Sequence, residues 1–299
     1  MRGLELALCY WEETGKPSLN SKYGEVLERA AVGLVGPGSE CYGFDDGISR
    51  DHDWGPAFCI WLGEEDFTIW GKSLARAYAV LPKEYAGYGP RIPLPGEEFR
   101  VGVSSRTVFY QRYTGLDHPP ETVAEWRKLS SLSLGVCTNG AVFADPEGGF
   151  SRWRRQLIDY FPLPVRLRMA AEYCIGVSQS GQYNYPRSLK RGDRFASAYS
   201  LMKFCTDAMH LCYLLNRRYV PYYKWLHRGL SELPLLGPAL ASRFSAALEE
   251  SEQTSQLIEW ICTDLAEEMR RQGMIDQADP YLLVHAESIM KRLEEEGNG

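Results

Sequence analysis

The segment AAVGLVGPGSECYGFDDGISRDHDWGPAFCIWL, residues 30–62, holds the pattern that decides the fold. It opens with a short apolar run, residues 30–36, which ends in glycine and therefore predicts a buried strand. A Gly/Ser turn follows at residues 37–39, and Ser39 stands where a helix could begin. Such a turn points backbone N–H groups outward and adds the positive end of a helix, so it suits a phosphate group. The segment closes with a second apolar strand pattern over residues 51–62.

Two aspartates begin the second strand pattern. Asp51 and Asp53 are two positions apart, and alternate side chains of a strand face the same side. We therefore expect the two carboxylates to project together, with His52 on the opposite face. Paired carboxylates suit Mg²⁺, which prefers oxygen ligands and commonly binds through one or two carboxylates together with substrate phosphates. Beside the phosphate-binding turn, they would hold a metal–nucleotide complex for an in-line displacement.

The residues on either side extend this pattern into a mixed domain. The spacing of apolar residues predicts a helix before the first strand, at 21–30, and another after the second, at 64–81. A loop rich in Pro and Gly, 82–97, leads to a third strand that begins near residue 99. Alternating strands and helices are typical of an α/β or α+β domain, and we assign residues 1–150 to it.

The second half of the chain predicts helices almost throughout. The turn residues DPEGG, which begin at Asp145, mark the boundary between the halves. We therefore expect an α+β fold, in which a small mixed sheet is followed by a C-terminal helical bundle over residues 151–299. The helices expected there are 151–161, which a serine would cap, 194–219, 250–270 and 280–295.

Composition narrows the class of protein without indicating an activity. The chain has 299 residues, of which 44% are hydrophobic and 24% charged, and its net charge is -6. These values are ordinary for a globular protein, and the acidic balance argues against nucleic acid as a partner. No apolar run reaches the roughly 18–20 residues of a membrane helix, and none of the eight cysteines forms a C-x-x-C pair. We expect a cytoplasmic protein with no membrane partner, whose cysteines are small core residues.

The motifs resemble the polymerase-β-like nucleotidyltransferase superfamily, whose signature is G-S followed further along by D-x-D. The matching residues here are Gly38, Ser39, Asp51 and Asp53. The longer context GSECYGFDDGISRDHDWGP is similar to a bacterial branch of unassigned function, and the likeness continues in NGAVFADPEGGFSRWRRQL, GQYNYPRSLKRGD and LLNRRYVPYYKWL. The resemblance implies a small nucleotidyltransferase domain with an appended helical bundle, as in kanamycin and lincosamide nucleotidyltransferases.

The resemblance also implies an activity. Enzymes of this kind move a nucleoside monophosphate, which we expect to be AMP from ATP, to a hydroxyl acceptor and release pyrophosphate. ATP or another nucleoside triphosphate would be the substrate, and one or two Mg²⁺ ions the cofactor. The acceptor would be a small molecule or a protein. The alternative is a nucleotide-binding regulatory module with the same fold and lost or weak catalysis.

Site residues follow from the same resemblance. Gly38 and Ser39 would contact the phosphates, while Asp51 and Asp53 would be catalytic and hold the metal. Arg50 would either pair with these acids or contact phosphate, and Lys224 either contacts phosphate or belongs to a basic cluster at a helix end. The residues expected to contact the nucleotide are thus Gly38, Ser39, Arg50, Arg187 and Lys224.

The chain departs from the superfamily at the third carboxylate, which usually lies on the next strand. That position falls at Gly102, and no acid occurs between Arg100 and Gln111. Without a third carboxylate the site would lack a general base or a further metal ligand. We expect Asp145 to serve as the third catalytic acid. The other acids that could do so are Glu97, Glu98, Asp117 and Glu172.

Overall fold

The structure, a computed structural model, forms two compact units. The expected boundary at residue 150 falls inside helix α7 (Gly149–Ile158), which belongs to the first unit. Helix α5 (Val123–Trp126) belongs to the second unit, although the chain returns to the first unit after it. The first unit is Met1–Glu121 with Leu129–Asp159, and the second is Thr122–Lys128 with Tyr160–Gly299. The residues described are 1–50, 53–249 and 253–297.

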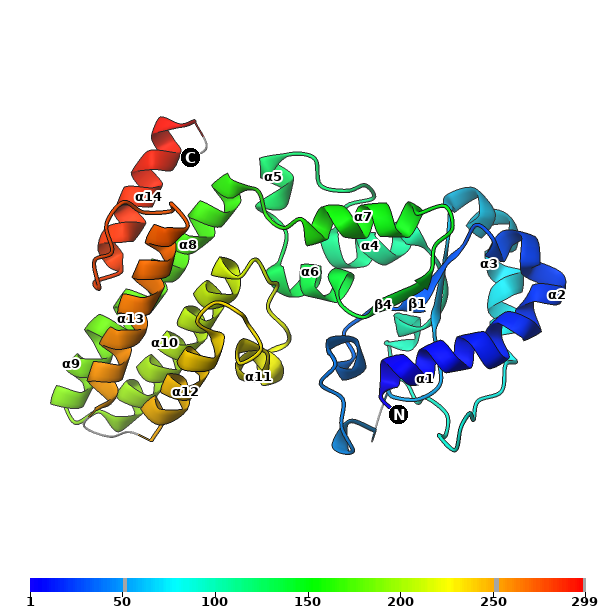
Figure 1. Ribbon diagram of the computed structural model, residues 1–299, viewed down its shortest axis with the longest axis horizontal. Coiled ribbons are helices and arrows are strands. Elements are labelled where there is room, and N and C mark those ends of the chain that lie inside the picture. Colours follow the sequence, from blue (N-terminus) through cyan, green and yellow to red (C-terminus); the bar gives the residue numbers. More distant parts are fainter. Residues whose placement is uncertain (51–52, 250–252, 298–299) are drawn as a thin grey trace. The chain divides into compact units, whose positions relative to one another are not determined.

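A four-stranded mixed sheet forms the centre of the first unit (Figure 1), with the strand order β3-β2-β1-β4. Strand β1 is antiparallel to both of its neighbours, whereas β2 and β3 are parallel. The chain therefore needs a crossover between β2 and β3, and helix α3 belongs to that connection. The strands are β1 (Ala31–Leu34), β2 (Cys59–Leu62), β3 (Gly102–Ser105) and β4 (Ala141–Ala144).

The first three strands were predicted, but the predicted ranges are longer than the strands themselves. The apolar run at 30–36 forms β1, as predicted, but among the described residues of the second pattern, 53–62, the strand begins only at Cys59. The edge strand β4 was not predicted, because four half-buried residues give little periodicity. Its close approach requires Gly33, where a Cβ atom would stand 2.3 Å from the Ala141 carbonyl oxygen.

Helices cover both faces of this sheet. On one face, apolar side chains of α1, α2 and α3 enclose Val32, Ile60 and Leu62. On the other face, Trp61 stacks on Phe150 of α7 with ring centroids 4.1 Å apart. The helices predicted at 21–30 and 64–81 are present, the first as the second half of α2. The remaining helices of this unit are α1 (Gly3–Tyr10), α2 (Lys16–Leu27), α3 (Glu64–Ala79), α4 (Arg106–Thr114) and α6 (Ser131–Thr138).

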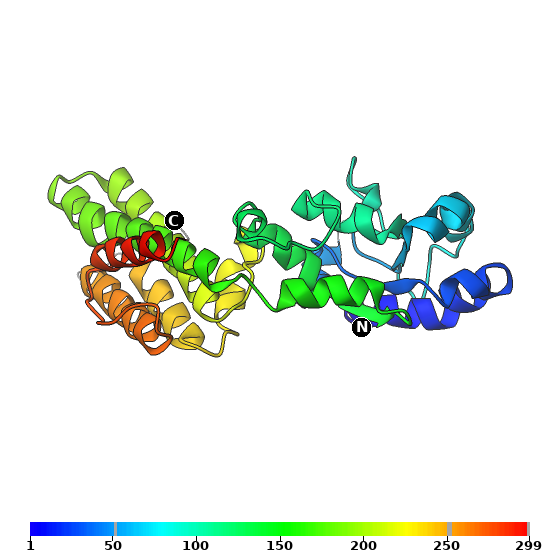
Figure 2. The same ribbon diagram turned by 90° about the horizontal axis from the view of Figure 1, so that it is seen from above.

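The described residues of the second unit form helices and connecting turns, as predicted. The long helix expected at 194–219 is α10 (Arg194–Leu215), which begins where the Asp193 side chain accepts the N–H of Ala196 over 2.9 Å. Helices α8, α10, α13 and α14 run alongside one another in both views (Figures 1 and 2). The others are α8 (Leu163–Val177), α9 (Tyr185–Lys190), α11 (Leu226–Leu230), α12 (Gly237–Ala247), α13 (Thr254–Arg271) and α14 (Leu283–Glu295).

The start of α7 differs from the prediction. The helix begins at Gly149, so Ser151 lies inside its first turn and does not cap it. The cap comes instead from Asp145, whose carboxylate accepts the Ser151 N–H over 2.7 Å. A carboxylate at a helix start satisfies a free N–H group and meets the positive end of the helix dipole.

The structure bears on two expectations from the composition, the absence of a membrane helix and the burial of the cysteines. Across the described ranges, no helix has both the length and the apolar character needed to cross a membrane. All eight cysteines are free thiols, and each of them except Cys9 is buried. Burial raises the pKa of the Cys174 and Cys205 thiols to about 12, so these two remain protonated core groups.

Candidate functional site

Strand β1 leads into a turn that the Asn139 side chain holds in place. Gly36 exchanges two hydrogen bonds with the side chain of Asn139: its N–H donates to Oδ1 over 3.1 Å, and its carbonyl accepts from Nδ2 over 2.6 Å. The turn ends at Gly38, after which Ser39–Tyr42 form one short 3-10 helix. The Gly/Ser turn is therefore present, and Ser39 is partly exposed at its tip.

Asp53 lies in a turn and not in a strand. Its φ angle is +44°, in the left-handed region that few residues other than glycine adopt, and β2 begins only at Cys59. Its N–H donates to the Ile92 carbonyl over 2.9 Å, which holds the backbone in this turn. The prediction that Asp53 occupies a strand is therefore wrong. Asp51 and His52 lie outside the described residues.

Asp53 is buried at the centre of a group of charged side chains, which we call the Asp53 cluster. Arg91 Nε donates to Asp53 Oδ1 over 2.8 Å, and Arg100 Nη1 donates to Oδ2 over 2.5 Å. Arg91 also pairs with Glu40 over 2.9 Å, and Arg100 with Glu97 over 2.7 Å. Both carboxylate oxygens of Asp53 are thus bound by guanidinium groups, and its side chain is only 3% exposed.

The charges of the Asp53 cluster nearly balance. Burial lowers the pKa of Arg91, but the carboxylates of Glu40 and Asp53 together raise it by more, so this pKa lies above the usual value. Three carboxylates face two guanidinium groups, which leaves one excess negative charge. Removal of Arg91 would leave the buried Glu40 carboxylate without its ion-pair partner, and such a charge is strongly destabilising.

The Asp53 cluster connects the Ser39 turn to Asp53. Glu40 directly follows Ser39, and its carboxylate approaches the turn so closely that a Cβ atom on Gly38 would stand 2.3 Å from Glu40 Oε2. The ion pairs of Arg91 with Glu40 and with Asp53 complete the connection. Two motifs separated in the sequence therefore meet at one end of the sheet.

A metal ion at Asp53 would have to compete with the arginines. Carboxylate oxygens are the ligands that Mg²⁺ prefers, but both oxygens of Asp53 accept hydrogen bonds from guanidinium groups. A divalent cation therefore fits only if it replaces Arg91 or Arg100 as a partner. In the described part of the chain, which leaves out Asp51, no group of three His, Cys, Asp or Glu side chains is placed to hold a metal. Mg²⁺ binding stays a prediction.

Strand β3 has no carboxylate where the third acid was sought, and Asp145 does not supply one. Gly102 begins β3 with a φ angle of +102°, a conformation that a larger side chain rarely adopts. Asp145 follows β4, and the antiparallel pairing of Val32 with Ala144 puts it at the start of β1. Since Ser39 lies beyond the other end of β1, the structure separates Asp145 from the Asp53 cluster.

The basic residues predicted to contact the nucleotide each lie against an aromatic ring. Arg50 is in the first unit, whereas Arg187 and Lys224 are in the second. Cation–π contacts at exposed sites contribute roughly 0.5–1 kcal/mol, which is enough to favour these positions without a ligand. Contact with a nucleotide stays a prediction for all three. The pairs are Arg50 on Trp54 at 4.9 Å, Arg187 on Tyr183 at 4.6 Å and Lys224 on Trp225 at 5.0 Å.

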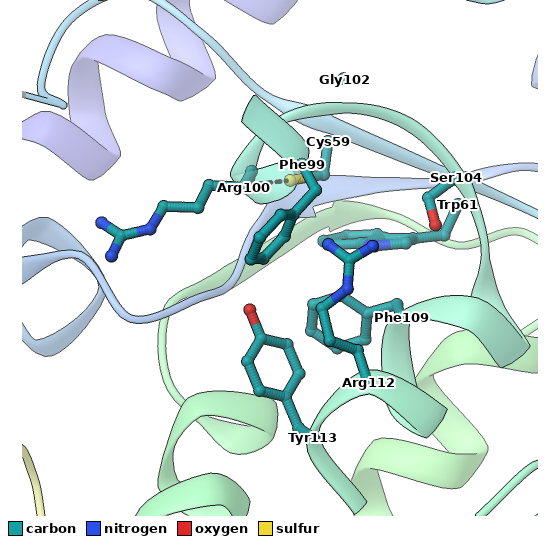
Figure 3. A pocket seen from close by; sticks show the side chains of 9 residues that line it. All are labelled: Cys59, Trp61, Phe99, Arg100, Gly102, Ser104, Phe109, Arg112 and Tyr113. Carbon is teal, nitrogen blue, oxygen red and sulfur yellow. Dashed lines mark hydrogen bonds between the residues drawn. The ribbon is translucent and has the colours of Figure 1, made fainter. Parts of the chain in front are cut away.

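A pocket next to the Asp53 cluster was not predicted (Figure 3). This aromatic pocket is shallow and partly open to solvent, and its cavity volume is about 20 Å³, roughly the room that one water molecule needs. Arg100 belongs to both sites, and its carbonyl accepts the Cys59 thiol over 3.3 Å. Burial raises the pKa of that thiol to about 12, so it stays protonated. Alternation along β2 and β3 shows which residues share a face, but not that the face is hollow. The lining residues are Cys59, Trp61, Phe99, Arg100, Gly102, Ser104, Phe109, Arg112 and Tyr113.

Comparison with known proteins adds one likeness. Residues 126–226 match a family described as a domain of unknown function (DUF4037). This stretch takes in parts of both units and leaves out Gly38, Ser39 and Asp53. No curated protein and no solved structure matches the chain. The class that the fold and the site define is thus an α+β protein with a mixed four-stranded sheet, which carries a buried Asp–Arg cluster beside an aromatic pocket.

Proposed function

We propose that the chain is a Mg²⁺-dependent nucleotidyltransferase of the polymerase-β-like kind, which moves AMP from ATP to a hydroxyl group of a small molecule or a protein. One observation carries this proposal. The two ion pairs of Arg91, one with Glu40 and one with Asp53, connect the Gly38–Ser39 turn to Asp53 at one end of the sheet. A phosphate-binding turn beside a carboxylate is what transfer from a metal–triphosphate complex requires.

The proposed reaction is a displacement at phosphorus. The acceptor oxygen forms a bond to the α-phosphorus, and the bond from that phosphorus to the oxygen bridging the β-phosphate breaks. Pyrophosphate leaves with the electron pair of that bond, and the hydroxyl proton passes to water. Backbone N–H groups of the turn and the Ser39 hydroxyl would bind phosphate oxygens. Mg²⁺, when held by Asp51 and Asp53, would neutralise the charge that develops on the triphosphate.

Arg91 and Arg100 would have a second role in this reaction. Both guanidinium groups bind Asp53, and both would lose that partner when the carboxylate binds a metal. Guanidinium groups match phosphate oxygens in charge and geometry, so the two arginines would then stabilise the triphosphate. The same side chains would thus hold Asp53 before the nucleotide binds and the phosphates afterwards.

The test is transfer of α-labelled nucleotide to a panel of hydroxyl acceptors, with pyrophosphate release measured in parallel. Asp51→Asn should lower the rate on the order of a hundredfold, as is common when a group that stabilises transition-state charge is lost. The matched control is Glu84→Gln, which changes an exposed acid of the same unit and should keep the full rate. Equal transfer by Asp51→Asn and the unaltered chain would contradict the proposal.

A second candidate is a nucleotide-binding regulatory module without turnover. The observation that favours it is the absence of an acid on β3, together with the neutralisation of Asp53 by two arginines. Calorimetry with ATP and Mg²⁺ separates the two candidates. Saturable binding with no pyrophosphate released for any acceptor supports the module, whereas release that depends on Asp51 excludes it.

A further inference from the structure

We propose that Asn139 is a positioning residue of the candidate site, which holds the Gly38–Ser39 turn in the shape that presents its N–H groups to a triphosphate. Arg154 keeps Asn139 in place. The role toward a triphosphate rests on the proposed nucleotidyl transfer. The hold of Asn139 on the turn does not, because it follows from the hydrogen bonds around residues 36–41.

Both ends of the Gly38–Ser39 turn are bound to one dipeptide, Asn139–Gly140. Before the turn, the Asn139 side chain accepts the Gly36 N–H over 3.1 Å and donates to the Gly36 carbonyl over 2.6 Å. After the turn, the Gly140 N–H donates to the Cys41 carbonyl over 2.7 Å. Residues 37–40 are thus a short loop whose two ends are fixed by a segment that lies far along the chain.

Arg154, in α7, fixes the dipeptide through its backbone. Nη2 of this arginine donates to the carbonyls of Thr138 and Asn139 over 2.6 and 2.7 Å. These carbonyls end helix α6, where a cation meets the negative end of the helix dipole. Within the described ranges the Arg154 guanidinium pairs with no carboxylate, and burial lowers its pKa. Its charge is therefore stabilised by backbone carbonyls of the segment that binds the turn.

The segment that holds the turn belongs to the part of the chain with a family match. Asn139, Gly140 and Arg154 all lie within residues 126–226, whereas the turn lies outside that range. The matched stretch therefore contributes to the candidate site through hydrogen bonds to the backbone of the turn, although it holds neither Ser39 nor Asp53.

A turn that is held before its ligand arrives binds more tightly than one that must first be ordered. Phosphate oxygens that the turn contacts are the same in the bound substrate and in the transition state, so weaker contact raises KM and leaves kcat unchanged. A merely structural defect has the opposite effect, because fewer folded molecules lower the apparent kcat at constant KM. The two kinds of loss can therefore be told apart.

Hydrogen exchange followed by mass spectrometry tests the hold on the turn without any activity. In Asn139→Ala, which removes two hydrogen bonds, the amides of residues 36–42 should exchange at least about tenfold faster, while those of β2 keep their rates. Asn139→Gln keeps the amide on a longer stem, so its turn should exchange at an intermediate rate. The matched control is Asn20→Ala, at an exposed position of α2, which should leave the exchange of the turn unchanged.

The part played by Arg154 has its own variant. Arg154→Lys keeps the charge but loses the planar group that spans neighbouring carbonyls, so residues 36–42 should again exchange faster, by a smaller factor than in Asn139→Ala. Arg155→Lys changes the next, exposed arginine of α7 and should have no effect. Equal exchange in these two lysine variants would remove Arg154 from the inference.

Calorimetry with inorganic tripolyphosphate and Mg²⁺ tests the role toward phosphate. We expect Asn139→Ala to bind this probe about tenfold more weakly than the unaltered chain does, and Asn20→Ala to bind it equally well. In the transfer assay, Asn139→Ala should raise the KM for ATP by a similar factor and change kcat by less than about threefold. Where Asn139→Ala does not fold, Asn139→Gln decides the question by the same measurements.

Four results would overturn the inference: unchanged exchange of the turn in Asn139→Ala, unchanged affinity of that variant for tripolyphosphate, no binding of tripolyphosphate by the unaltered chain, or a lower kcat at constant KM. The outcome is separate from that of the proposed function. If tripolyphosphate affinity falls as expected but the unaltered chain transfers no nucleotide, the positioning role stands and the proposed function fails. If transfer occurs and Asn139→Ala leaves its KM unchanged, the proposed function stands and the positioning role fails.

Discussion

Arg91→Met offers the sharpest test of the Asp53 cluster. The arginine side chain is 7% exposed, and it separates two carboxylates that are each 3% exposed. Methionine keeps most of the volume of the stem but removes the charge, which leaves Glu40 unpaired and Asp53 with one partner. Breaking a buried ion pair from one side costs about 3–5 kcal/mol. A unit of this size loses about 2–4 °C of Tm per kcal/mol, so we expect a fall of about 6–20 °C.

The measurement is thermal unfolding followed by near-ultraviolet circular dichroism. Arg91→Lys keeps the charge without the forked geometry, so its Tm should lie between those of Arg91→Met and the unaltered chain. Arg76→Met, at an exposed position of α3, should stay within about 1 °C of the unaltered chain, as is usual for surface substitutions. A shift for Arg91→Met as small as that of Arg76→Met would refute the assignment of a buried, partnered arginine.

Three further predictions concern other parts of the chain. Gly102→Asp places an acid on β3 but forces it into a φ angle of +102°, so it should lower the free energy of unfolding in urea by about 1–3 kcal/mol without raising the rate of nucleotidyl transfer. An unchanged urea midpoint would argue against that backbone strain. Burial lowers the pKa of His210 in the folded chain, so the unfolded chain takes up this proton at a higher pH than the folded chain does. The folded state therefore keeps its full stability above about pH 6.5 and loses part of it as the pH falls below that value. His210→Phe should therefore reduce the fall in Tm between about pH 7 and pH 5, and an identical fall in both proteins would disprove this. A thiol reagent should modify Cys9 alone in the native chain and all eight cysteines in urea, whereas rapid reaction of a second thiol would contradict the burial.

Local sequence patterns were enough to predict the helices and strands that bury one continuous stripe of apolar side chains. Strand β1 is apolar throughout, and α13 repeats Leu257, Ile261, Leu265 and Met269 at helical spacing, all of them buried. In both cases the residues that determine the structure are neighbours in the sequence. Strand β4 and the early start of α7 were missed, because Asn139 and Asp145 act through hydrogen bonds that periodicity does not reveal.

The candidate site depends even more on contacts between residues that are far apart in the sequence. The Gly38–Ser39 turn could be predicted, because glycine and serine after an apolar run carry their own signal. The conformation of Asp53 could not, because its partners Arg91 and Arg100 follow it by 38 and 47 residues. Arg91 stands in a loop without periodicity and Arg100 ends a short 3-10 helix before β3, and nothing in the local sequence distinguishes either from a surface arginine.

The two arginines that bind Asp53 also close a loop. Both ends of the stretch from Arg91 to Arg100 meet at one carboxylate, while residues 92–96 between them are exposed. The entropy of closing such a loop changes slowly with its length, so a short insertion there should leave the fold intact. A cysteine at Leu94, labelled with an environment-sensitive dye, would turn this loop into a reporter. Its fluorescence would follow the release of either arginine from Asp53, and it would do so before any substrate is known.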